Sequence, residues 1–293
     1  MKKILVISML LMTGKVLGQG VEAELYQYNY AFVHPAFAGS EGQRISVMAR
    51  TQRYKANLGN GADNTMVLMS YENHFDKINS GVALTGYSER VGPSSLSSFA
   101  VSYNYKLTFG ASSELITGIR AKRHFYSLSD DYYRQIEPSD PLLDQDLSAS
   151  NWAADLGVLL RVKESYFGLV ANDLLHTDNR IDFIGSPSRF GINYAGIIGT
   201  SFTISEHLMS EHSLYILFDD ETYRVDLNNT LTIIDLFLAG FSVERSDDKF
   251  FVRGNAGLKV KDYCQVLFLF YSDKRDDTLS RKFRGEVFIG FTF

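Results

Sequence analysis

The sequence predicts an all-β protein: a transmembrane antiparallel β-barrel of about 14 strands, formed by residues 43–293. Segments in which apolar and polar residues alternate recur along the whole chain. The chain is rich in aromatic residues, with 17 Tyr and 21 Phe, and no later apolar run is long enough for a membrane-spanning helix. It also begins like an exported protein. Together these features are typical of a barrel in an outer membrane.

Residues 1–18 have the pattern of a secretory signal peptide. Lys2 and Lys3 precede the apolar run ILVISMLLM, and the small residues of GKVLGQG follow it. We place the cleavage after Gly18, with cleavage two residues later as the alternative, so that residues 19–42 precede the barrel. A membrane anchor is the competing interpretation, but about 12 apolar residues are too few to span a bilayer. The single cysteine excludes an internal disulfide.

Alternation with a period of two identifies the strands, because successive side chains of a strand point to opposite faces. In SFAVSYNYKLT at 98–108, aromatic and aliphatic residues alternate with Ser, Asn and Lys, and NWAADLGVLLRVK at 151–163 shows the same pattern. The predicted strands are 43–52, 64–72, 79–88, 97–108, 113–125, 151–163, 165–172, 189–202, 212–219, 222–231, 234–244, 249–260, 263–272 and 283–293.

The lengths of the connections test this count. If both ends of the chain are periplasmic, connections after odd-numbered strands face outside and can be long, whereas those after even-numbered strands should be tight. The long connections 126–150, 173–188 and 273–282 follow predicted strands five, seven and thirteen. Those after strands four, six and twelve are short. The exception is 203–211, which is predicted to be long although it lies on the periplasmic side.

The last strand is predicted to close the barrel by pairing with the first. Phe291 and Phe293 share one face with aliphatic residues, and Glu286 lies on the other. A closed barrel leaves no free strand edge, and aromatic rings are favoured at the membrane interface. The terminal aromatic strand also resembles the signal that barrel-insertion machinery reads. The competing fold is a soluble periplasmic β-sandwich, which would have to bury the Tyr and Phe of a dozen strands in one core.

Charged residues on the second face of the strands are expected to line the lumen, because a charge at the bilayer midplane of a barrel costs about 2–4 kcal/mol. Two interpretations remain open: a selectivity lining for solutes, or a packed interior of ion pairs that stiffens the barrel. The predicted lumen-facing charges are Arg120, Lys122, Asp155, Arg161, Arg224 and Asp226.

Two segments are candidates for a plug or lid. Residues 19–42 are too irregular for a strand, and Pro35 and Gly39 are turn-formers within them. The acidic connection 126–150 is the other candidate; it could bind calcium, although simple hydration is the preferred interpretation.

The sequence contains no recognisable catalytic chemistry. HExxH, GxSxG, P-loop and CxxC patterns are missing, so we predict no catalytic residue, no metal and no cofactor. His207 and His212 in EHLMSEH are five residues apart, which suits neither a strand face nor a helix face, and 206–212 is interpreted as an exposed turn. Cys264 shares an apolar face and is interpreted as a small hydrophobic residue. The net charge of −5 argues against nucleic acid as a partner.

The segment YQYNYAFVHPAFAGSEGQRISVMARTQRY resembles the N-terminus of the PorP/SprF family of type IX secretion membrane proteins. The family pattern is a Gln-Tyr element, then Asn-Pro-Ala-Tyr-Ala-Gly, then a strand that ends in Arg-x-Gln-Trp. His34, Phe37 and Arg53 replace the Asn, Tyr and Trp of this pattern. The matching positions are Gln27, Tyr28, Pro35, Ala36, Ala38, Gly39, Arg50 and Gln52.

Later elements resemble the family in the same order. YFGLVANDLL at 166–175, the Asp-Leu-Asn at 226–228 and LAGFSVER at 238–245 each resemble a strand of its members. Gly92 and Pro93 sit in a shared turn, and the final strand resembles the closing strand of the family, with Gly285 in place of a His.

The resemblance implies a non-enzymatic outer-membrane component of a type IX secretion system, a machine that exports proteins carrying a conserved C-terminal domain. Its partners would be the periplasmic ring and translocon proteins, a secreted adhesin, and outer-membrane lipid. The matching residues, together with His34, are then candidates for partner binding. The alternative function is a solute channel of the fatty-acid-transporter type, since such barrels also have about 14 strands and an N-terminal plug. A third possibility, an outer-membrane enzyme, has no candidate triad.

Overall fold

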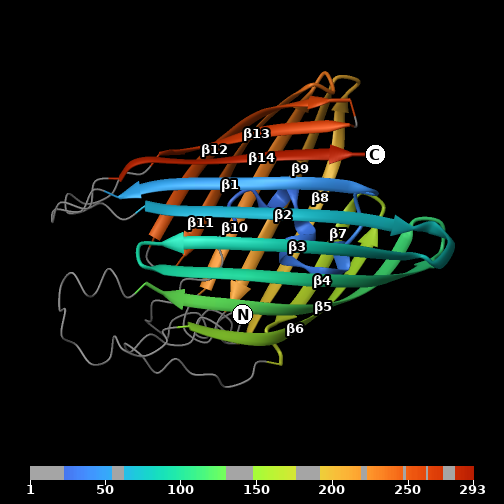
Figure 1. The fold of residues 1–293 in the computed structure, drawn as a ribbon. Helices are drawn as coiled ribbons and strands as arrows, with labels where there is room; N and C mark the ends of the chain where they lie inside the picture. The colour runs from blue at the N-terminus through green and yellow to red at the C-terminus, as the bar shows by residue number, and fades with distance from the viewer. Residues whose placement is uncertain are drawn as a thin grey trace, which may run out of the picture.

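Fourteen antiparallel strands close into one barrel in the computed structural model, which describes residues 23–54, 63–129, 148–175, 192–218, 223–246, 249–261, 263–272 and 281–293 (Figure 1). Each strand pairs with its neighbours in sequence, and β1 pairs with β14. The strands are β1 (Arg44–Tyr54), β2 (Asp63–Phe75), β3 (Ser80–Val91), β4 (Ser94–Phe109), β5 (Ser113–Leu128), β6 (Ser148–Val162), β7 (Ser165–Asn172), β8 (Asn193–Ser205), β9 (Leu208–Phe218), β10 (Tyr223–Ile233), β11 (Phe237–Ser246), β12 (Lys249–Val260), β13 (Cys264–Ser272) and β14 (Arg281–Thr292).

Four short helices accompany the strands in the described part of the chain. Three of them precede β1: η1 (Tyr26–Tyr28), α2 (Tyr30–Val33) and η2 (Pro35–Phe37). The fourth, η3 (Asp76–Ile78), lies between β2 and β3. No helix among the described residues is long and apolar enough to cross a membrane.

The predicted number and order of strands are confirmed. β7 and β12 have the predicted bounds, and most other strands extend past at least one predicted end. The extensions consist largely of polar residues such as Ser94 and Ser148. A strand keeps its ladder of hydrogen bonds beyond the hydrocarbon layer, where its outer face no longer needs to be apolar. The sequence pattern therefore identifies the part of each strand that crosses the membrane, but it does not identify where the whole strand ends.

The last strand closes the barrel along almost its full length. The register runs from Arg44 opposite Thr292 to Arg50 opposite Glu286, and the Phe293 N–H donates to the Gln43 carbonyl at 2.9 Å. The ring of Phe293 lies on the outside of the barrel, whereas Glu286 is buried inside. The soluble sandwich is thereby excluded. Recognition of this strand by insertion machinery stays a prediction.

The two ends of the barrel differ in their connections. After even-numbered strands the connections are tight, and we call this the turn end; the opposite end is the loop end. In an outer-membrane barrel the short turns face the periplasm. The described connections at the turn end are 76–79, 110–112, 163–164, 206–207 and 234–236, and between β12 and β13 the structure describes residues 261 and 263. Much of the acidic connection 126–150 lies outside the described residues.

The expected long connection 203–211 is wrong. β8 continues to Ser205 and β9 begins at Leu208, so the turn consists of Glu206 and His207 alone. The polar residues that suggested a loop belong to strand ends at the membrane surface. With this correction, every described connection at the turn end is short.

His212 is therefore not part of an exposed turn. It lies in β9 on the outer face, opposite Asn229 of β10. The Asn229 side-chain amide donates to His212 Nδ1 at 2.8 Å, and the Phe202 ring stacks on the imidazole with centroids 5.1 Å apart. Among the residues that the structure describes, no group of three or more His, Cys, Asp or Glu is arranged to hold a metal ion.

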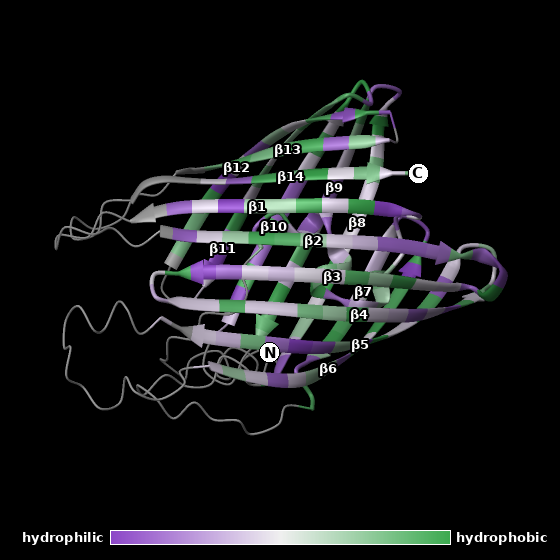
Figure 2. Ribbon diagram, viewed as in Figure 1, coloured by the Kyte–Doolittle hydropathy of each residue, from purple (hydrophilic) through white to green (hydrophobic). Residues whose placement is uncertain are grey.

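The two faces of the barrel wall differ in chemistry. Outward side chains are apolar and exposed, for example Phe99, Tyr103 and Leu156, whereas the inward face carries buried charges such as Asp226. Hydrophobic and hydrophilic colours accordingly alternate along the strands in Figure 2. This arrangement is the reverse of a soluble barrel, and it fits lipid outside and a polar lumen inside.

Candidate functional site

The N-terminal segment, defined as Ala23–Gly39, lies inside the barrel, where Figure 1 shows its blue helices behind the front strands. Its helices have only three or four residues each. Tyr26 and Phe37 are buried in one hydrophobic cluster with the inward-facing Met48 and Phe288. Since such short helices are unstable alone, the shape of the segment depends on its contacts with the wall.

Tyrosine hydroxyls tie the segment to the strands β10 and β12. The Asn228 side-chain amide donates to the hydroxyl of Tyr26 at 2.6 Å. The hydroxyl of Tyr28 lies 3.0 Å from Thr230 Oγ1 and donates to Asn255 Oδ1 at 3.2 Å. Burial raises the pKa of Tyr26 and of Tyr28, so both phenols keep their protons at neutral pH.

On the opposite wall the segment is accommodated by glycines. A Cβ atom at Gly118 would lie 2.4 Å from the backbone nitrogen of Ala36, and one at Gly81 would lie 2.0 Å from the Ala38 carbonyl oxygen. Asn104 lies beside them, and its amide donates to the Ala36 and Ala38 carbonyls at 2.8 and 2.7 Å. We call the four inward glycines that contact the segment the glycine berth: Gly81, Gly118, Gly157 and Gly168. The segment leaves no room for a larger residue there, because its backbone lies against Gly81 and Gly118 and the His34 side chain lies against Gly157 and Gly168.

His34 fills the part of the berth that Gly157 and Gly168 leave open. Its Nδ1 accepts the Ala36 N–H at 3.2 Å and so caps η2. Its Nε2 lies 3.1 Å from the Leu169 carbonyl oxygen. Because Nδ1 accepts and a carbonyl can only accept, the imidazole is the neutral tautomer with its proton on Nε2.

The environment of His34 opposes a charged imidazole. Burial, together with the nearby guanidinium of Arg120, lowers its pKa to about 4. An asparagine, the residue of the family pattern, could cap η2 in the same way through its side-chain oxygen. The substitution by histidine therefore preserves the cap and adds a contact to β7.

The segment ends at the turn end of the barrel. Pro35 begins η2 at its first position, where a missing N–H costs no hydrogen bond. Gly39 has φ +69°, and its N–H donates to Glu72 Oε2 at 3.0 Å. A side chain at position 39 would also collide with the Asn73 carbonyl oxygen, 2.3 Å from a Cβ atom. Both turn-formers that the sequence identified thus suit the backbone positions that they occupy.

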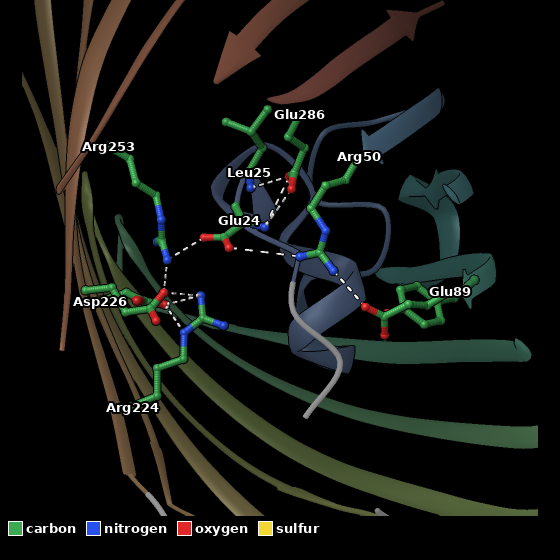
Figure 3. A network of polar contacts seen from close by, with 10 residues as sticks. Glu24, Leu25, Arg50, Glu89, Arg224, Asp226, Arg253 and Glu286 are labelled. Atoms are coloured by element: carbon green, nitrogen blue, oxygen red, sulfur yellow. Dashed lines mark hydrogen bonds and ion pairs between the residues drawn. The ribbon is translucent and has the colours of Figure 1, made fainter. Parts of the chain in front are cut away.

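Charged groups hold the start of the segment at the wall of β1, β12 and β14 (Figure 3). The carboxylate of Glu286 accepts the backbone N–H groups of Glu24 and Leu25 at 3.1 and 2.7 Å. The side chain of Glu24 pairs with Arg253 at 2.5 Å and with Arg50 at 3.9 Å. Buried carboxylates need such partners: Glu24 is paired with two arginines, and Glu286 is hydrogen-bonded by two backbone N–H groups.

Further pairs extend this group, which we call the Glu24 cluster. Arg50 also pairs with Glu89 at 2.7 Å. Glu244 pairs with Arg253 and, at 3.3 Å, with Arg224. The cluster is therefore a network that joins the N-terminal segment to six strands. Its members are Glu24, Arg50, Glu89, Arg224, Asp226, Glu244, Arg253 and Glu286.

A second network, the Arg120 cluster, lies on β5, β6 and the end of β7. Arg120 pairs with Asp155, and Lys122 pairs with Asp155 at 2.7 Å and with Asp173 at 2.8 Å. Arg120 Nη1 also donates to the Ala31 carbonyl at 3.0 Å. This cluster contacts the segment through backbone carbonyls, and its charges are paired within the wall.

The predicted lumen-facing charges all lie on the inner face. Arg120, Lys122 and Asp155 belong to the Arg120 cluster, whereas Arg224 and Asp226 pair at 2.8 Å in the Glu24 cluster. Arg161 lies apart, half-buried at the turn end, and pairs with Glu114 at 3.5 Å. These ion pairs correspond to the interpretation of the lumen as a packed, salt-bridged interior.

The family-motif residues also face the interior. Arg50 and Gln52 point inward from β1 and are 3% and 1% exposed. The others lie within the segment, and most are fully buried: Gln27, Tyr28, His34, Pro35, Ala36, Ala38 and Gly39. In this arrangement most motif residues are buried inside the barrel, whereas Gln27 is partly exposed, and their role in partner binding stays a prediction.

Several residues of the site are not among those predicted from the sequence. Glu24 is the only charged residue between Ala23 and Gly39, which was a usable signal for a buried ion pair. Nothing in the sequence identifies Arg253 of β12 as the partner of Glu24. Nothing in the sequence around Gly118 indicates that this residue contacts the N-terminal segment. Phe288, an aromatic residue on the polar face of its strand, lies 5.7 Å from the Tyr28 ring.

Comparison with solved structures supports the fold alone. The chain is similar to the toluene transporter TbuX of Ralstonia pickettii, with 8% identity, a TM-score of 0.55 and 95% of each chain covered. It is also similar to the toluene transporter TodX of Pseudomonas putida (8% identity, TM-score 0.51, 95% of each chain) and to the monoaromatic hydrocarbon channel CymD (10%, 0.54, 95% of each chain). No curated protein matches the sequence.

The family is identified by a match over most of the chain. Residues 18–272 match the model of the type IX secretion system membrane protein PorP/SprF. This agrees with the motifs in the N-terminal segment and with the closed barrel. The chain therefore belongs to the PorP/SprF family and is an outer-membrane β-barrel component of a type IX secretion system.

Proposed function

We propose that the protein is a non-enzymatic secretion component whose lumen is closed by the N-terminal segment, and that it works by binding partners at its rims. Those partners are the periplasmic ring and translocon proteins of the system, or a secreted adhesin that the barrel holds at the cell surface. A barrel with a filled lumen transmits no solute, so its function depends on its surfaces.

The observation that carries this proposal is the way the segment is held on all sides. It contacts Glu72 of β2, Asn104 of β4, Leu169 of β7, Asn228 of β10 and Glu286 of β14. Displacing it would expose buried apolar rings and leave paired charges without partners, which is costly.

Partner binding is tested by deletion and purification. We expect the protein, extracted in mild detergent, to co-purify with other type IX components, and we expect its deletion to remove one or more proteins carrying the conserved C-terminal domain from the culture medium or cell surface. Recovery of the barrel alone, together with an unchanged set of exported proteins, would refute the proposal.

A solute channel is the second candidate, because the proteins with similar folds include toluene transporters and a monoaromatic hydrocarbon channel. Planar-bilayer recording separates the two. A closed lumen predicts no steady single-channel current from the wild-type protein, whereas deletion of residues 23–39 should produce one. Steady current from the wild type would favour the channel.

A further inference from the structure

The outer face of β3–β6 changes from apolar to polar near the loop end. On β4 the outward residues from Phe109 to Phe99 are apolar or tyrosine, and they are followed by Ser97 and Ser95. Ten residues at about 3.3 Å each, on a strand tilted by about 40°, span roughly 25 Å, which is the height of the apolar band of an outer-membrane barrel. Phe99 therefore marks the boundary between hydrocarbon and headgroups.

Arg123 lies at this boundary on the outside of β5. It pairs laterally with Phe99 of β4 and Trp152 of β6. Its guanidinium lies 5.0 Å from the centroid of the Phe125 ring and 5.2 Å from that of Trp152. All three rings are about half exposed. A positive charge is thus held between aromatic rings at the height of the lipid headgroups.

Within the described strands β3–β6, no carboxylate on the same face compensates this charge. The outward positions of β3–β6 hold two charged residues, Arg90 and Arg123, and both are positive. The polar contact of Arg123 is a hydrogen bond of 3.4 Å to Ser150 Oγ, and Arg90 donates to the Gly92 carbonyl at 3.4 Å.

Serine hydroxyls fill the space between the two arginines. Ser95 and Ser127 are hydrogen-bonded at 2.7 Å, and Ser88 and Ser97 at 3.1 Å. Hydroxyl groups can donate to an anion, and none of them adds a competing negative charge. The surface is therefore cationic at its edges and hydrogen-bonding in its centre.

We propose that Arg123, framed by Phe125 and Trp152, binds the phosphate of a phosphorylated lipid headgroup in the outer leaflet, and that Arg90 and the serines form the rest of the site. A guanidinium presents a planar fork of N–H donors that matches phosphate oxygens. The flanking rings orient the fork and contact the lipid below it. This site is independent of the lumen and of the proposed rim partners.

The test uses full-length protein refolded in detergent without lipid. Binding of diphosphorylated lipid A is followed by the shift in thermal unfolding midpoint, for the wild type and for Arg123→Gln. We expect Arg123→Gln to bind lipid A with an affinity about tenfold lower than that of the wild type, because one charge-assisted contact is lost. Arg123→Lys keeps the charge but not the fork and should be intermediate.

Controls separate this site from general electrostatics. Arg245 is an exposed arginine on the outer face of β11, opposite Phe250, and Arg245→Gln should bind lipid A like the wild type. Dephosphorylated lipid A and inorganic phosphate should each give little shift. The proposal is overturned if Arg123→Gln binds normally, if Arg245→Gln loses as much affinity, or if either of these ligands matches lipid A.

Discussion

The two sides of the lumen hold the same segment by different means. On β3–β7 the main constraint is steric: besides hydrogen bonds from Asn104 and Arg120, the segment lies against the glycine berth, with a backbone nitrogen 2.4 Å from where a side chain at Gly118 would begin. On β1 and β10–β14 it is electrostatic: Glu24 pairs with arginines, and Glu286 accepts two backbone N–H groups. Shape fixes where the segment lies, and charge fixes the path of its first residues.

Because the two sides hold the segment by different interactions, substitutions on the two sides should weaken its docking to different extents. A buried charge that loses its partner has no inexpensive alternative, whereas an overpacked side chain can be partly accommodated by small shifts. Docking of the segment can be measured by the labelling rate of a cysteine placed at Ala31, which is 1% exposed, in a Cys264→Ser background. The labelling rate rises as docking weakens.

The largest effect is expected from Arg253→Gln. The change removes a shared partner of Glu24 and Glu244, and breaking such a buried pair costs about 3 kcal/mol. Labelling at position 31 should therefore accelerate about 100-fold. Arg245→Gln on the outer face is the matched control and should have no effect. An unchanged rate in Arg253→Gln would show that charge does not hold the segment.

A smaller effect is expected from Gly118→Leu. The new side chain would overlap the backbone of Ala36 and cost about 2 kcal/mol, or an increase in labelling rate of about 30-fold. Gly86→Leu is the control, because a Cβ atom there meets nothing within 4 Å. If both leucine variants label alike, the glycine berth does not position the segment.

Acidification should loosen the segment through His34. Its pKa is about 4 when docked and about 6.5 when released, so protonation favours release as the pH falls below 6.5 and adds nothing further below 4. Between pH 7.5 and 5.5 docking should weaken by about 1.4 kcal/mol, roughly tenfold in rate after normalisation to a free thiol at each pH. His34→Asn keeps the cap of η2 and should remove this part of the pH dependence; an equal dependence in both proteins would contradict the assignment.

The smallest effect is expected at the rim. The pair of Arg161 and Glu114 is half-buried, with side chains 31% and 23% exposed, and water screens such pairs. Arg161→Gln should change the free energy of unfolding in lipid vesicles by about 0.5 kcal/mol or less, measured in urea. A loss comparable with that of Arg253→Gln would mean that depth in the lumen does not set the strength of these pairs.

Much of the fold was predictable because a barrel wall repeats one local rule. Alternation identified all fourteen strands, and it failed mainly where strands continue in polar sequence beyond the membrane, as between Phe202 and His212. The inward direction of Arg120 and Asp155 followed from the same rule. The partners of the inward-facing charges could not be predicted from this rule. Barrel closure brings together strands that are far apart in the sequence, as with Arg50 and Glu286.

The sequence by itself determined the strands, the two faces of the wall and the family motif, because each depends on spacing along the chain. Only the tertiary structure decided that the motif turns inward, that Glu24 meets Arg253, and that Gly118 makes room for Ala36. Those contacts join residues that are close in space only after the barrel has closed. Ring closure, a property of the whole sheet, sets which side chains share the lumen.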